Sequence, residues 1–138
     1  MTTINALIDE YAALQPDKTF MISPEAGSEM SYGQLKRHCE EISCYLDALN
    51  IHKGEKVAFL LPNGYWSAAL LLGVIYSGRI IVPLNAVSGD ASLSYVIEHS
   101  QSRVILVDAD SRKKFSSVLQ ALPDTVRIID TDINNGPE

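Results

Sequence analysis

Apolar residues recur at helical spacing in two segments near the start of the chain. Over residues 4–15 the spacing predicts a surface helix with one apolar stripe, which Pro16 ends. A short apolar run at 19–22 and a turn segment follow. Ser31 and Gln34 fit a capping box, which predicts the start of a second helix. The apolar stripe of that helix consists of Leu35, Cys39, Ile42, Leu46 and Leu49.

The longest apolar run, NGYWSAALLLGVIYSGRIIVPLN, spans residues 63–85 and is about as long as a membrane-spanning helix. Gly78 and Arg79 interrupt it. Glycine is favoured just past a helix end, and the β-branched residues 80–82 favour a strand. A charged residue after only three to four helical turns leaves no segment long enough to cross a bilayer. The run therefore predicts a helix, a turn and a strand, with no membrane span.

Apolar segments beginning at residues 57, 80, 104 and 126 predict the strands of a parallel sheet. Their spacing of roughly 22 to 24 residues suits right-handed βαβ crossovers. Helices are expected near Ser88 to Asp90, with Leu93, Val96 and Ile97 buried, and over residues 111–121. The predicted fold class is α/β, a doubly wound and mostly parallel sheet with helices on both faces.

The whole chain, residues 1–138, is predicted to form a single α/β subdomain. Residues 1–56 supply the first helix, short strands and the long helix. Residues 57–130 form a βαβαβαβ core. The tail, residues 131–138, has no apolar periodicity and is predicted to be a loop.

Composition narrows the classes of partner. The formal net charge is −6 and the pI is near 5.0, which argues against a nucleic-acid or anionic-membrane surface. The first fifteen residues carry two acids, no basic region and no continuous apolar core, unlike a secretory or transit signal. The sequence therefore predicts a cytoplasmic protein.

Open parallel sheets bind ligands at the carboxyl ends of their strands, so candidate functional residues are expected at those ends. Asp108 and Asp110 follow the third core strand and are suitable for Mg²⁺ or acid–base work, but capping of a helix at Ser111 by Asp110 is favoured. GSEMSYGQLK departs from a phosphate loop, because Gln34 stands where lysine is required. Asn63 and Asn85 are predicted turn formers.

Histidines, cysteines and aromatic residues give no catalytic pattern. His38, His52 and His99 have no serine or cysteine partner at a recognisable spacing. Cys39 and Cys44 are turned about 140° apart on a regular helix, which excludes a disulfide, and their spacing matches no zinc site. Core packing is the default expectation for the larger aromatic side chains, namely Tyr65, Trp66, Tyr76 and Tyr95.

Residues 60–110, LLPNGYWSAALLLGVIYSGRIIVPLNAVSGDASLSYVIEHSQSRVILVDAD, closely resemble the early region of the AMP-forming adenylating enzymes. These are the acyl-CoA synthetases, the aryl-CoA ligases and the adenylation domains of peptide synthetases. The upstream pieces PDKTFMIS and MSYGQLKRHCEEISCYLDALNIHKGEKVAF resemble the same family, in the same order. The resemblance implies the first subdomain of a longer enzyme.

The resemblance implies a full-length enzyme that uses ATP and Mg²⁺ to join a carboxylic acid to AMP. The acyl group then passes to the thiol of coenzyme A or of a carrier-protein pantetheine. No stretch of this sequence matches the family's phosphate loop, adenine segment, ribose segment or catalytic lysine. We therefore expect no catalytic, cofactor-binding or metal-binding residue within 1–138, and no tight cofactor binding. Some CoA ligases carry a basic residue where this chain has Val87.

The sequence is compatible with three interpretations. The first is the N-terminal part of an acid:thiol ligase, inactive alone, whose partner is the remainder of the ligase in the same or another chain. Its exposed apolar face favours self-association. The second is a stand-alone, non-catalytic binding or assembly module. The third, a flavodoxin-like or receiver-like domain, has little support from the loops.

Overall fold

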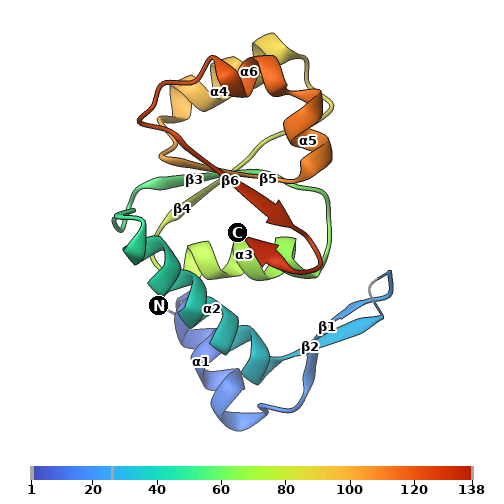
Figure 1. The fold of residues 1–138 in the computed structure, drawn as a ribbon. Helices are drawn as coiled ribbons and strands as arrows, with labels where there is room; N and C mark the ends of the chain where they lie inside the picture. Colours follow the sequence, from blue (N-terminus) through green and yellow to red (C-terminus); the bar gives the residue numbers. More distant parts are fainter. Residues whose placement is uncertain (1, 26, 138) are drawn as a thin grey trace.

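The computed structural model describes residues 2–25 and 27–137. Its N-terminal third consists of two helices and a β-hairpin that lies apart from the main sheet (Figure 1). The hairpin strands are antiparallel, and the second leads directly into the long helix. These elements are α1 (Ile4–Leu14), β1 (Thr19–Ser23), β2 (Ser28–Ser31) and α2 (Tyr32–Ala48).

The main sheet has five strands in the order β4-β3-β5-β6-β7. The first four are mutually parallel, as predicted, and β7 pairs antiparallel with β6. The central strands β3 and β5 are buried almost throughout, because helices cover both faces. The strands are β3 (Lys56–Leu60), β4 (Ile80–Pro83), β5 (Val104–Val107), β6 (Arg127–Asp132) and β7 (Gly136–Pro137).

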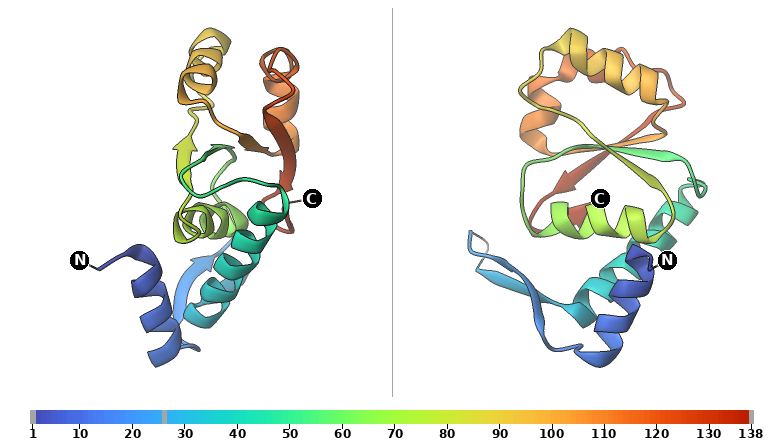
Figure 2. Two further views of the ribbon diagram at one scale, coloured as in Figure 1. Left: turned by 90° about the vertical axis from the view of Figure 1, so that its left-hand side faces the viewer. Right: turned by 180° about the vertical axis from the view of Figure 1, so that it is seen from behind.

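The sheet divides the molecule into two apolar cores. Helices α2 and α3 pack on one face, and α4, α5 and α6 lie over the other (Figures 1 and 2). A third cluster fastens α1 and the hairpin to α2 and α3. The predicted doubly wound α/β class is therefore confirmed. The remaining helices are α3 (Tyr65–Tyr76), α4 (Asp90–Ser100), α5 (Ala109–Lys114) and α6 (Ser116–Gln120).

The boundary between α3 and β4 follows the predicted turn. Gly78 has φ +81°, a left-handed conformation that glycine adopts without strain. Its amide donates to the Ile75 carbonyl, and the Arg79 amide donates to the Val74 carbonyl. This is a Schellman ending, and it separates the apolar run into a helix of four turns at most and a strand. Among the described residues, no helix is long and apolar enough to cross a membrane.

Four expectations are wrong in detail. Residues 111–121 do not form one helix, because α5 ends at Lys114 and α6 begins at Ser116. The predicted loop at 131–138 instead extends β6 and forms β7, while its last residue lies outside the described residues. On α4, Val96 is exposed although Leu93 and Ile97 are buried, and Tyr95 is exposed as well.

Candidate functional site

The carboxyl ends of β3, β5 and β6 meet at one edge of the sheet. Strand β4 lies on one side of β3 and β5 on the other, so the chain leaves β3 toward β4 but leaves β5 in the opposite direction, toward β6. Such a switch point opens a crevice in doubly wound folds and is the usual ligand position. A cavity of about 940 Å³ lies there, between the strand ends and α5.

Charged side chains of both signs line this edge cavity. The lining includes four carboxylates and two cations, namely Asp108, Asp110, Asp130, Asp132, Arg112 and Lys113. The parallel register explains the meeting of distant residues, because Val107 of β5 is the partner of Asp130 on β6. Sequence reasoning identified both acidic segments as strand ends, but not the cations beside them.

Most of these carboxylates already have local partners. Asp108, rather than Asp110, is the N-cap of α5, and it accepts a hydrogen bond from the Ser111 amide at 3.2 Å. Arg112 forms an ion pair with Asp130. Asp132 accepts from the Asn134 amide at 2.7 Å, and hydrogen bonds from that amide and from Asn135 lower the pKa of its carboxyl. The edge cavity is therefore built from capping and turn interactions.

No group of three or more His, Cys, Asp or Glu side chains within residues 2–25 and 27–137 is arranged to hold a metal ion. The expectation that 1–138 contains no catalytic or cofactor-binding residue stays a prediction. Asn85 behaves as the predicted turn former, since its Oδ1 accepts from the Val87 amide at 2.9 Å. Asn63 lies in the loop before α3 and lines a second hollow.

The second hollow, which we name the hairpin groove, lies between the β1–β2 hairpin, α3 and the end of β4. Its volume is about 730 Å³. It is lined mainly by apolar residues, among them Phe20, Met21, Ile22, Phe59, Leu61, Leu71, Leu72, Ile81 and Leu84. Glu25 is the charged residue among its described lining residues. The groove is thus chemically unlike the edge cavity.

The three histidines lie in separate places. His38 is buried between α2 and α3, where its Nε2 is 2.9 Å from the Tyr65 hydroxyl and its ring packs against Trp66. Its Nδ1 has no hydrogen-bond partner among the described residues, although the Glu41 carboxylate is 3.7 Å away. Burial lowers the pKa of His38, an effect that Glu41 opposes. Burial therefore favours the neutral form of the ring.

His52 is exposed, and the ring of His99 stacks on Tyr95 at 5.3 Å. Cys39 is buried and Cys44 is exposed, as the stripe of α2 predicted. Burial raises the pKa of the Cys39 thiol to about 12, so this thiol is protonated and inert. The described histidines and cysteines do not assemble a nucleophile and base.

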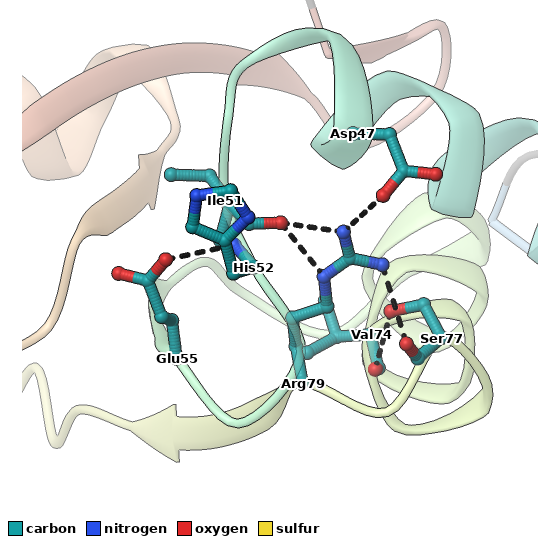
Figure 3. Close-up of polar contacts among 7 residues, drawn as sticks. All are labelled: Asp47, Ile51, His52, Glu55, Val74, Ser77 and Arg79. Atoms are coloured by element: carbon teal, nitrogen blue, oxygen red, sulfur yellow. Dashed lines mark hydrogen bonds and ion pairs between the residues drawn. The ribbon is translucent and has the colours of Figure 1, made fainter.

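Arg79 is a structural residue whose partners the sequence did not reveal. Its side chain is only 1% exposed. Figure 3 shows the guanidinium between the end of α2 and the end of α3, donating to the carbonyl oxygens of Ile51 and Ser77. It also pairs with Asp47, whose side chain is 70% exposed. This one cation joins three chain segments around the α3–β4 turn.

The sequence model of the AMP-binding enzyme family matches residues 8–137. The chain is 31% identical over 118 residues to the sulfoacetate–CoA ligase of Cupriavidus necator, covering 86% of this chain and 23% of that enzyme. It is 24% identical over 131 residues to nonribosomal peptide synthetase 5 of Gibberella zeae, covering 95% of this chain and 1% of that synthetase. These relatives are much longer than the chain.

Solved structures show the same fold. The N-terminal domain of FACL13 from Mycobacterium tuberculosis superposes with a TM-score of 0.84 at 26% identity, over 94% of this chain and 34% of that domain. A benzoate CoA ligase from Burkholderia xenovorans LB400 gives a TM-score of 0.84 at 18% identity, over 99% of this chain and 27% of that enzyme. The chain thus corresponds to about a third of the FACL13 domain.

Proposed function

This chain belongs to the AMP-binding enzyme family, and from that premise we propose that it is the N-terminal part of an ATP-dependent, AMP-forming acid:thiol ligase. The match over residues 8–137 carries the proposal. The parent enzyme activates a carboxylic acid as acyl-AMP with ATP and Mg²⁺. It then transfers the acyl group to coenzyme A or a carrier-protein pantetheine. We place this ligase in the cytoplasm.

The isolated chain is proposed to be inactive, and the edge cavity supports this. Transfer of a nucleotidyl group requires cations or amide donors aimed at the phosphates. The edge cavity offers Arg112, which Asp130 already neutralises, together with Lys113, and it carries four carboxylates. A polyphosphate would meet a surplus of negative charge there. The groups that bind ATP are therefore supplied by residues outside 1–138.

The thiol acceptor depends on the loop after β4. Val87 is 91% exposed, at the position where some CoA ligases of the family carry a basic residue. An exposed valine provides no charge for a CoA phosphate, which weakens the case for that contact and leaves a carrier-protein thiol open as the acceptor. The aliphatic or aromatic nature of the acid is set by parts of the ligase beyond this chain.

Acid-dependent exchange between ATP and pyrophosphate tests the proposal. We expect none from the 138-residue chain with a panel of carboxylic acids, while the full-length sulfoacetate–CoA ligase of C. necator serves as the positive control. Clear exchange by the chain would refute its inactivity.

A second measurement is the intact mass of the native protein in its source cells, detected with an antibody against this chain. A species several times larger than 15.1 kDa supports a ligase. A species near 15.1 kDa that binds no complementing chain supports a stand-alone module instead.

A further inference from the structure

A further cavity, of about 570 Å³, lies at the edge of the sheet opposite the edge cavity. Residues just before β5 and β6 line it, whereas residues that follow β5 and end β6 line the edge cavity. Its walls come from α4 and α6, which lie side by side over one face of the sheet (Figure 1). We name it the α4–α6 cavity, and its lining lies within residues 94–103 and 118–126.

The α4–α6 cavity has a buried apolar part. Ile97 is 1% exposed and Val118 is 5% exposed, and both belong to the core between the helices and the sheet. Leu122 and Val126 are half-buried beside them. Pockets for small organic molecules typically have about 300–1,000 Å³ and a mostly apolar lining with a few polar groups. This cavity therefore has the size and the apolar surface for a small organic ligand.

Two charged side chains, Glu98 and Arg103, are among the described residues that line the α4–α6 cavity. Nη1 of Arg103 donates to Oε2 of Glu55 at 2.5 Å, so the charge of the arginine is already balanced. The Glu98 carboxylate forms no hydrogen bond or ion pair within residues 2–25 and 27–137. The balance of charge at the cavity is therefore negative, which favours a cation.

The position of Glu98 on its helix has the same consequence. Glu98 lies in the last turn of α4, which ends at Ser100. The C-terminal end of a helix carries partial negative charge, so it is stabilised by a cation and destabilised by a carboxylate. The side chain of Gln101, the residue that caps this end, also lines the cavity. A cation bound beside Glu98 would relieve the repulsion between the carboxylate and the helix end.

We propose that the α4–α6 cavity is a binding site for a small organic cation, an amine with an apolar body. The ammonium group pairs with the Glu98 carboxylate near the end of α4. The apolar body lies against Ile97, Val118 and Leu122. The site is separate from the edge cavity, and its ligand class does not depend on the ligase assignment.

Two probes of opposite charge test the site. Cyclohexylmethylamine is protonated at about pH 7, and cyclohexanecarboxylate presents the same ring with a negative charge. Each is titrated into the isotope-labelled 138-residue chain, and binding is followed by amide chemical shifts. We expect the amine to saturate, with shifts at Gln101, Leu122 and Thr125, which line the cavity. We expect the carboxylate to bind about tenfold more weakly, because it meets the Glu98 carboxylate instead of a cation.

The variant Glu98→Gln keeps the size of the side chain and should weaken binding of the amine about tenfold. Ala121→Phe adds a ring to the lining and should also weaken it. Both positions are exposed, so both variants should keep the circular-dichroism spectrum of the parent chain. The matched control is Glu10→Gln on α1, which removes an exposed carboxylate outside the lining and should leave the affinity unchanged.

Three results would overturn the proposal. The first is a set of shifts that do not saturate with the amine. The second is an equal or higher affinity for the carboxylate, which would assign the ionic contact to Arg103. The third is an equal affinity of Glu98→Gln and Glu10→Gln for the amine. Pyrophosphate exchange and native mass test the ligase assignment separately, so the two proposals fail independently.

Discussion

Replacing Arg79 should destabilise the chain through the two carbonyl groups that its guanidinium satisfies. Methionine in its place keeps an apolar stem of similar length but removes every donor. The Ile51 and Ser77 carbonyls would then lose charged hydrogen bonds, each of which contributes about 1.5–3 kcal/mol. We therefore expect Arg79→Met to lower the free energy of unfolding by about 3–5 kcal/mol, a large part of the about 5–15 kcal/mol of an ordinary domain.

The ion pair with Asp47 contributes little to that total, because the Asp47 side chain is 70% exposed and water screens it. Exposed pairs contribute about 0–1 kcal/mol. Asp47→Asn should therefore cost under about 1 kcal/mol. Arg79→Lys should restore only part of the loss, because a single ammonium does not reproduce the planar fork that reaches both carbonyls.

Urea unfolding followed by circular dichroism measures these differences. The expected order of stability is wild type, Asp47→Asn, Arg79→Lys and Arg79→Met. If Arg79→Met costs under about 1 kcal/mol, the two carbonyls find other partners and the argument from their hydrogen bonds is wrong. If Asp47→Asn is as damaging as Arg79→Met, the ion pair rather than the carbonyl network holds the turn.

Three further predictions concern α2 and its contact with α3. Iodoacetamide should modify Cys44 alone in the folded chain, because burial protects Cys39 and raises the pKa of its thiol to about 12. The intact mass of the treated protein should show one adduct in buffer and two in urea. Gly73→Ala should lower the free energy of unfolding by about 1–3 kcal/mol, because an added Cβ would lie 2.5 Å from Cδ1 of Ile42. An unchanged midpoint in urea unfolding would contradict this close packing. Burial lowers the pKa of His38 in the folded chain, whereas the unfolded chain has the ordinary value of about 6.5. As the pH falls below about 6.5, the unfolded chain therefore binds a proton more readily than the folded chain does. The free energy of unfolding then decreases until the pH reaches the lowered pKa of the folded chain. The loss of stability between about pH 7.5 and 5.5 should shrink in His38→Gln, and equal losses would show that His38 is not responsible.

The features that the sequence predicted correctly are those with a local physical signal. The capping box forms, since Ser31 accepts from the Gln34 amide and Gln34 accepts from the Ser31 amide. The stripe of α2 placed Cys39 inside and Cys44 outside, because a period of 3.6 residues reports which side chains face the core. The continuous apolar strands β3 and β5 are central in the sheet, as burial on both faces requires.

The features that the sequence did not predict correctly are helix boundaries and side-chain burial, which depend on how the helices pack against the sheet. Phe115 is buried, and its backbone has φ −107° and ψ 25°, which departs from helical geometry, so α5 ends at Lys114 and α6 begins at Ser116. Both Asp108 and Asp110 are good caps, and sequence alone does not fix a helix start to within two residues. On α4, Leu93 and Ile97 face the sheet, which leaves Val96 at the border of the stripe and 39% exposed.

The candidate site was the least predictable part, because β5, β6 and α5 form it only after the parallel register is set. The switch point supplies the crevice, yet Arg112 is engaged by Asp130 and four carboxylates share the lining. A ligand phosphate becomes stable there only when other cations or amide donors outweigh those carboxylates.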